Sequence, residues 1–134
     1  MREILFRGKR IDDGKWMSGL PCNNIYGALS IQPITEKCCA VIRPETVGQF
    51  TGLTDKNGKK IFEGDIGKYK QTDGATQNGK PITCIGKVIY NAKTASFAVE
   101  SKDKVGCKYF DYFPIKDFEV IGNIHDNPEL LGGE

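Results

Sequence analysis

The side chains best suited by type and spacing to bind an anion are lysines gathered in residues 49–70, QFTGLTDKNGKKIFEGDIGKYK. Lysine ammonium groups contact phosphate, and small β domains bind nucleic acid where such a cationic face adjoins aromatic side chains. We predict that any nucleic-acid binding by this chain is carried by these lysines and one lysine beyond them: Lys56, Lys59, Lys60, Lys68, Lys70 and Lys87. An alternative stays open, because edge strands also carry lysine to prevent association between sheets.

The same stretch does not have the pattern of a phosphate-cradling loop. Such a loop frames four residues between two glycines and continues with Lys and then Ser or Thr. Here Gly52 and Gly58 are too far apart, and Lys59 is followed by another lysine. Asn57-Gly58 between apolar flanks instead predicts a β-hairpin with a tight turn of type I′. We interpret Gly64 and Asp65 as structural residues at a second bend.

Acid–base and metal chemistry find little support in the residue pattern. His125 is the only histidine, and Asp126 and Glu129 beside it are typical of a helix start. The paired carboxylates Asp12 and Asp13 precede Gly14 in a turn, where burial cannot raise a pKa. No nucleophile-elbow pattern is present. We predict no catalytic residue, no metal and no cofactor, and therefore a protein that is not an enzyme.

The five cysteines also argue for a structural role. Their number is odd and no C-x-x-C pair occurs, so we predict small, half-buried apolar thiols with no disulfide. The opening MREILFRGKR carries charge where a signal peptide needs an apolar core, and no apolar run approaches a membrane span. We expect a soluble cytoplasmic protein with no membrane partner.

Aromatic side chains are concentrated in KYFDYFPIKDF, which holds five of the twelve Phe and Tyr residues. Strand alternation places Tyr109, Asp111 and Phe113 on one face and Phe110 and Tyr112 on the other. Aromatics on both faces predict either a subunit interface or a central strand covered within the monomer. For the first case the candidate interface residues are Tyr109, Phe110, Tyr112 and Phe113.

Length and charge are those of a single globular domain. The chain has 134 residues and a net charge of +2, far from the balance of a strongly basic nucleic-acid binder. The charge is uneven, because residues 1–108 carry 18 basic and 11 acidic groups, whereas residues 109–134 carry 1 and 6. We expect a body with a basic tendency and an acidic C-terminal end.

The elements that must hold these side chains are strands. Sixteen glycines and short apolar runs predict many turns, and Gly or Pro interrupts every helical period. We predict a mostly β domain of hairpins. Residues 49–134 form a small partly open barrel, SH3-like or similar, and residues 1–48 are N-terminal hairpins that extend it. Asn127, Pro128 and Glu129 predict one short C-terminal helical turn with Asn127 as its cap.

Two motifs together carry a family resemblance: VGQFTGLTDKNGKKIFEGDI and FEVIGNIHDNPELL. With REILFRGKRIDDGKWMSG and RPETVGQFTG they make the chain similar to the YopX family of phage and prophage proteins over nearly its whole length. The resemblance implies a mostly β, phage-associated protein. It supplies no catalytic residue to carry over.

These observations favour a phage-derived accessory protein that acts by binding. Nucleic acid is the sharper hypothesis for its ligand, and a self-assembling interaction module without a nucleic-acid role is the alternative. An enzyme of unrecognised type ranks third. We also predict a homo-oligomer, because a small sheet with open edges and two-sided aromatics must protect both.

Overall fold

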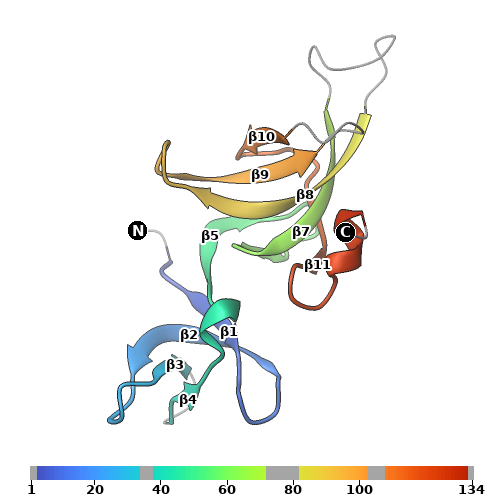
Figure 1. Cartoon of the computed structure of the whole chain (residues 1–134). Helices are drawn as coiled ribbons and strands as arrows, with labels where there is room; N and C mark the ends of the chain where they lie inside the picture. The colour runs from blue at the N-terminus through green and yellow to red at the C-terminus, as the bar shows by residue number, and fades with distance from the viewer. Residues whose placement is uncertain (1–2, 34–37, 72–81, 103–107, 133–134) are drawn as a thin grey trace. The chain divides into compact units, whose positions relative to one another are not determined.

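The computed structural model describes residues 3–33, 38–71, 82–102 and 108–132, and every structural statement below concerns these residues (Figure 1). The predicted loop 71–81 and Cys107 lie outside them, apart from the backbone of residue 71. The expected mostly β fold of hairpins with one short C-terminal helical turn is confirmed. Its strands form two antiparallel sheets, and neither closes into a barrel in the described part of the chain.

The chain divides into two compact units, residues 1–52 and 53–134. The boundary falls inside a strand, four residues beyond the division at 48 that we predicted. The single-domain organisation stays a prediction.

The first unit is a sheet built from successive hairpins. Its strands are β1 (Phe6–Lys9), β2 (Trp16–Asn23), β3 (Leu29–Pro33), β4 (Ala40–Val41) and β5 (Gly48–Thr54), with the 3-10 turn η1 (Pro44–Thr46) before β5. The hydrogen-bonded order is β4-β3-β2-β1-β5, and β6 continues it beyond the unit boundary. Ile31 and Ile42 are fully buried, and Gly8 lies directly against Ile42.

The second unit is built around a five-stranded sheet. The strands of this sheet are β7 (Asp65–Gln71), β8 (Ile82–Asn91), β9 (Ser96–Lys102), β10 (Lys108–Tyr112) and β11 (Glu119–Asn123). The unit also contains β6 (Lys60–Phe62), which belongs to the other sheet. The order of the five is β10-β9-β8-β7-β11, so β10 and β11 are its edges. The register of β11 on β7 shifts between Val120 and Gly122.

One face of this sheet holds the core of the second unit. Tyr69, Val88 and Val99 lie on three neighbouring strands and pack with Ile61 and Phe118. Phe118 lies so close to the backbone of Gly67 that a Cβ there would stand 2.0 Å from its ring. We call this the inner face. The opposite, outer face carries the residues that alternate with these.

The turn at Asn57-Gly58 is tight, as predicted, but its type is not I′. Type I′ needs positive φ at both central residues, and here only Gly58 has it, at 82°. The Asp55 carbonyl accepts a hydrogen bond from the Gly58 N–H at 3.0 Å, and the Asp55 N–H donates to the Lys59 carbonyl at 2.7 Å. This is a type I turn closed by a left-handed glycine.

The Asp55 side chain explains why the chain forms a type I turn here and not a type I′ turn. One carboxylate oxygen accepts the N–H groups of Asn57 and Lys59, both at 2.9 Å, which stabilises the bend. The other oxygen accepts the Val120 N–H at 2.9 Å and so ties the hairpin to β11. Burial opposes ionisation here, but the three N–H groups and the charge of Lys59 outweigh it and lower the pKa of Asp55.

The bend at Gly64-Asp65 is structural, as interpreted from the sequence. Gly64 has φ of 91°, and the buried Asp65 carboxylate accepts the Phe62 N–H at 2.8 Å. The final turn η3 (Pro128–Leu131) is also present, but Asn127 does not cap it. Its side chain instead accepts the Asn123 N–H at 3.3 Å. In the part of the chain that the structure describes, no helix has the length and apolar character to cross a membrane.

Replacing Asp55 separates its two roles. Asp55→Ala should lower the free energy of unfolding by about 2–4 kcal/mol, because three N–H groups lose their acceptor. Asp55→Asn keeps an oxygen for the turn but turns a donor toward Val120, so a loss of about 1–3 kcal/mol is expected. Urea unfolding at pH 7 measures both.

The pH dependence gives the control. A carboxylate whose folded pKa is lowered contributes stability that is complete above its unfolded pKa of about 4 and is lost as pH falls through the folded pKa. Wild-type protein should therefore lose more stability between pH 6 and pH 3 than Asp55→Asn does. Equal losses in the two proteins would contradict the assigned role.

Gly67→Ala tests the packing of the inner face. The new methyl group meets the Phe118 ring, so the variant should unfold with about 1–3 kcal/mol less free energy than wild type. Phe118→Leu makes room, and the double variant should be more stable than the sum of the single effects predicts. Strictly additive losses in urea unfolding would argue against this contact.

Candidate nucleic-acid interface

Three of the predicted lysines lie on the outer face of the five-stranded sheet. The register pairs Lys68 with Ile85 and Lys70 with Thr83 across β7 and β8, and it places Lys87 on the same face. The alternating positions Tyr69 and Val88 point into the core, which fixes the lysines outward. The structure therefore brings these three side chains together on one surface.

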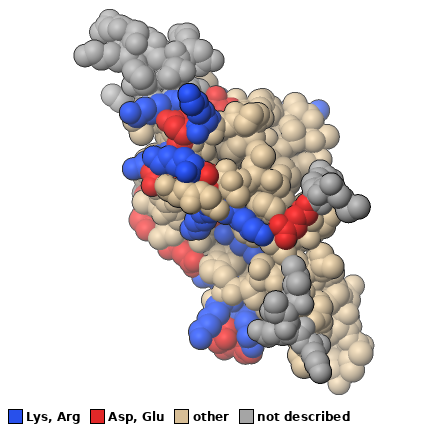
Figure 2. All heavy atoms as spheres, turned by 180° about the vertical axis from the view of Figure 1, so that it is seen from behind, with Lys and Arg blue, Asp and Glu red and all other residues tan. Residues whose placement is uncertain are grey.

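Two glutamates on that face each hold a pair of lysines. The Glu119 carboxylate lies 3.6 Å from Lys56 Nζ and 3.5 Å from Lys68 Nζ. The Glu100 carboxylate lies 3.4 Å from both Lys87 Nζ and Lys108 Nζ. In the view of Figure 2, basic atoms likewise lie next to acidic ones in several places. Each glutamate leaves one positive charge in excess in its group.

These ion pairs position the ammonium groups more than they stabilise the fold. The lysine side chains are 39–57% exposed, and exposed ion pairs contribute about 0–1 kcal/mol each. A lysine held at a fixed site loses less conformational freedom when a phosphate approaches it. Shared carboxylates therefore make an ordered cationic surface with a modest net charge.

Aromatic side chains from the edge strand reach the same face. Phe110 lies opposite Glu100 and Tyr112 opposite Ala98, and both rings are exposed, at 42% and 45%. The Asn91 side-chain amide donates to the Tyr112 hydroxyl at 3.0 Å and fixes that ring. Ile85, also exposed, lies between the aromatics and β7.

The other two candidate interface residues lie on the opposite side of β10 or beyond it. Tyr109 is paired with Ser101, so its side chain lies on the inner face of the sheet. Phe113 packs edge-on against Phe118 with ring centroids 5.3 Å apart. Asp111 accepts a hydrogen bond from the Tyr69 hydroxyl, and burial together with this bond raises the pKa of Tyr69. The predicted alternation along this strand agrees with the structure.

Lys59 and Lys60 stay at the β5–β6 hairpin, where both are exposed. Lys56 reaches from that hairpin to Glu119 and so joins the outer face. Sequence reasoning missed Lys102 and Lys108, which pair with each other across β9 and β10. Their alternation with Glu100 and Phe110 was the signal that could have found them.

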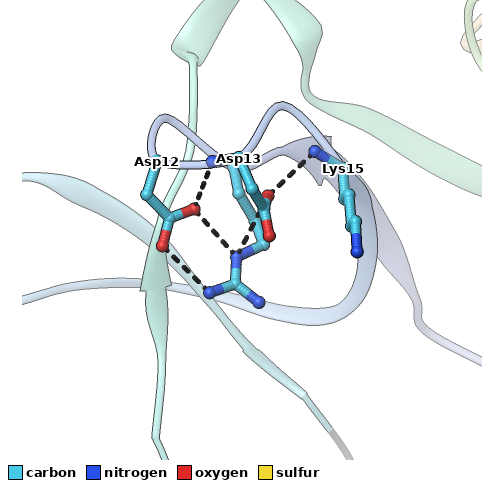
Figure 3. Close-up of polar contacts among 4 residues, drawn as sticks. Asp12, Asp13 and Lys15 are labelled. Atoms are coloured by element: carbon cyan, nitrogen blue, oxygen red, sulfur yellow. Dashed lines mark hydrogen bonds and ion pairs between the residues drawn. The ribbon is translucent and has the colours of Figure 1, made fainter.

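The paired carboxylates of the first unit are engaged by an arginine (Figure 3). The Arg10 guanidinium donates to both oxygens of Asp12, at 3.1 and 3.0 Å, and lies 3.5 Å from Asp13. These hydrogen bonds hold the pKa of Asp12 below its ordinary value. Asp13 also accepts the Lys15 N–H at 2.9 Å. The pair therefore shapes a turn, and its lack of an acid–base role stays a prediction.

The remaining candidate metal ligands and the cysteine thiols do not form a reactive site in the described residues. No three His, Cys, Asp or Glu residues of the described ranges gather closely enough to hold a metal ion. Cys22 and Cys84 carry free thiols that are half-buried, as predicted, whereas the free thiols of Cys38 and Cys39 are exposed, so the prediction was wrong for these two. Burial raises the pKa of Cys22 and of Cys84, which lowers the fraction of reactive thiolate at both. The absence of a metal, a cofactor and a disulfide stays a prediction.

Comparisons with known proteins agree with this fold. The sequence profile of the YopX protein family matches residues 6–132. No curated protein sequence matches the chain. Among solved structures the chain is similar to the crystal structure of protein EF1440 from Enterococcus faecalis, with a TM-score of 0.52 and 21% identity. That match covers 98% of this chain and 99% of the other, and at this identity it shows the fold alone.

Proposed function

The chain belongs to the YopX family of phage-type proteins, and from this premise we propose that it acts by binding single-stranded nucleic acid on the outer face of its five-stranded sheet. The observation that carries the proposal is the meeting of Lys68, Lys87 and Lys108 with Phe110 and Tyr112 on one surface. In this proposal the protein is an accessory factor in the cytoplasm of a bacterial host, and it is not an enzyme.

The chemistry of the face suits a single strand better than a duplex. Phe110 and Tyr112 follow each other at alternate positions of one strand, so successive unstacked bases could lie on the two rings. Lysines on the neighbouring strands flank the rings and suit the phosphates between those bases. Among the described residues, the strands of this face carry no helix that could enter a major groove.

The modest net charge agrees with this ligand. Because Glu100 and Glu119 cancel half of the four ammonium charges that they hold, binding must depend on stacking as well as on phosphate contacts. Stacking contributes about 1–3 kcal/mol per base and tolerates any sequence. We therefore expect weak sequence preference and a shallow salt dependence, with a slope of about −0.7 for each phosphate neutralised.

Anisotropy of a labelled thymidine oligonucleotide about 20 nucleotides long tests this face at low salt. Phe110→Ala with Tyr112→Ala should weaken binding by roughly 5- to 150-fold per base unstacked. Tyr109→Ala is the matched control, because it removes an exposed ring from the opposite face of the same strand. Lys68→Glu with Lys87→Glu should abolish binding, and Glu100→Gln should strengthen it.

The hairpin lysines are tested in parallel. Lys59→Glu with Lys60→Glu should change affinity less than Lys68→Glu with Lys87→Glu if the outer face is the site. Wild-type protein that binds neither single- nor double-stranded DNA or RNA at low salt would remove the proposal.

A self-assembling module is the second candidate, and the position of β10 favours it. This strand is an edge of the sheet and presents Phe110 and Tyr112, so pairing with another copy would cover both an open edge and two exposed rings. The acidic residues 117–134 could steer such an encounter toward a basic surface.

Light scattering at micromolar concentration measures the association state. A homo-oligomer should fall to the mass of one chain on Tyr112→Glu, with the fold retained by circular dichroism. Thr94→Glu in the β8–β9 turn is the control and should leave the mass unchanged. A wild-type mass of one chain at every concentration would eliminate this candidate.

A further inference from the structure

The β2–β3 hairpin of the first unit ends in two large apolar side chains that face solvent. Ile25 is 91% exposed and Tyr26 is 86% exposed, the two largest exposures among the large hydrophobic residues described. The corner positions of a turn normally hold polar residues, because they gain nothing from burial. This tip therefore places apolar surface where folding does not need it.

The same turn occurs a second time in the chain with a polar corner. At 24–28 the Asn24 N–H donates to the Ala28 carbonyl at 2.9 Å, and the Gly27 N–H donates to the Asn24 carbonyl at 2.9 Å. The Asn24 side-chain oxygen accepts the N–H groups of Tyr26 and Ala28, both at 2.9 Å. Gly27 has φ of 81°.

Residues 55–59 make the equivalent four bonds with Asp55 and Gly58. There the two corner residues are Lys56 and Asn57. The same turn backbone therefore forms with a lysine and an asparagine at its two corner positions, and it does not need apolar residues there. The turn does not require Ile25 and Tyr26, and the turn at residues 55–59 serves as the control for them.

The hairpin that carries the tip has no charged residue of its own. Residues 16–35 contain no Asp, Glu, Lys, Arg or His, although 27% of the chain is charged. A hairpin that supplies no cation does not itself attract a phosphate backbone or an acidic membrane. Leu20 on β2 is also exposed, at 50%. The occupant that matches this hairpin is an uncharged apolar surface.

The small area of the tip indicates what shape a binding partner must have. The two side chains present roughly 300 Å², so two facing tips would bury about 600 Å² in total, below the ~1,200 Å² of a stable interface. A symmetric contact between copies of this chain is therefore too small. A projecting tip gains enough contact only when a concave partner also covers its sides.

We propose that Ile25 and Tyr26 form an anchor for a different protein, one that presents an uncharged apolar pocket with a hydrogen-bond acceptor for the Tyr26 hydroxyl. Tyrosine is enriched among the residues that dominate binding energy at interfaces. The Asn24 bonds hold the tip in one conformation before binding, which lowers the entropic cost of association. This surface is independent of the outer face of the second unit.

The test exchanges the corners of the two turns. A photo-crosslinking phenylalanine analogue is placed at position 26, and in a second protein at position 57, in cells that encode the chain. A polypeptide crosslinked from position 26 and not from position 57 is then purified, and its affinity is measured by calorimetry. Wild type should bind at least about tenfold more tightly than Ile25→Lys with Tyr26→Asn.

The reciprocal variant, Lys56→Ile with Asn57→Tyr, should bind the purified partner as wild type does. Circular dichroism and thermal melting verify that both exchanged proteins fold. The proposal is overturned if position 26 crosslinks no polypeptide above the level of position 57, if it crosslinks only a second copy of this chain, or if Ile25→Lys with Tyr26→Asn binds the partner as tightly as wild type. Loss of oligonucleotide binding with partner binding intact would affect only the proposed function of the outer face.

Discussion

The contact between Phe118 and the bare backbone of Gly67 decides which side of the second sheet is inside. A side chain at 67 would exclude the ring, and without the ring Tyr69, Val88 and Val99 would lose their cover. Since side chains alternate along a strand, fixing one set on the inner face places the alternating set, which includes Lys68, Lys87 and Phe110, on the outer face. The lysines and aromatics of the outer face therefore owe their common surface to a packing contact on the opposite side of the sheet.

Local patterns in the sequence predicted local structure well. The tight turn at Asn57-Gly58 and the bend at Gly64 follow from residue chemistry within a few positions. The alternation along β10 correctly separated Phe110 from Tyr109. The turn type was wrong because Asp55 can accept two N–H groups in a type I turn, and this gain outweighs the twist preference of type I′.

The candidate site could be predicted only in part, because it depends on strand order. Nothing near Lys68 in the sequence shows that Glu119 will lie beside it, since β11 joins β7 from some fifty residues away. Lys87 and Lys108 meet at Glu100 only once β8, β9 and β10 are aligned. The sequence alone identified the lysines, but only the strand order shows which of them lie on the outer face and which lie at the hairpin.

The two edges of the second sheet differ in regularity. β10 pairs with β9 in unbroken register over its five residues, whereas β11 shifts register between Val120 and Gly122. Such a bulge twists an edge away from regular pairing, so the sheet can be extended in one direction only. If two copies met edge to edge through β10, the regular edge of each five-stranded sheet would be paired. The result would be a continuous sheet of ten strands whose two ends are the irregular β11 strands.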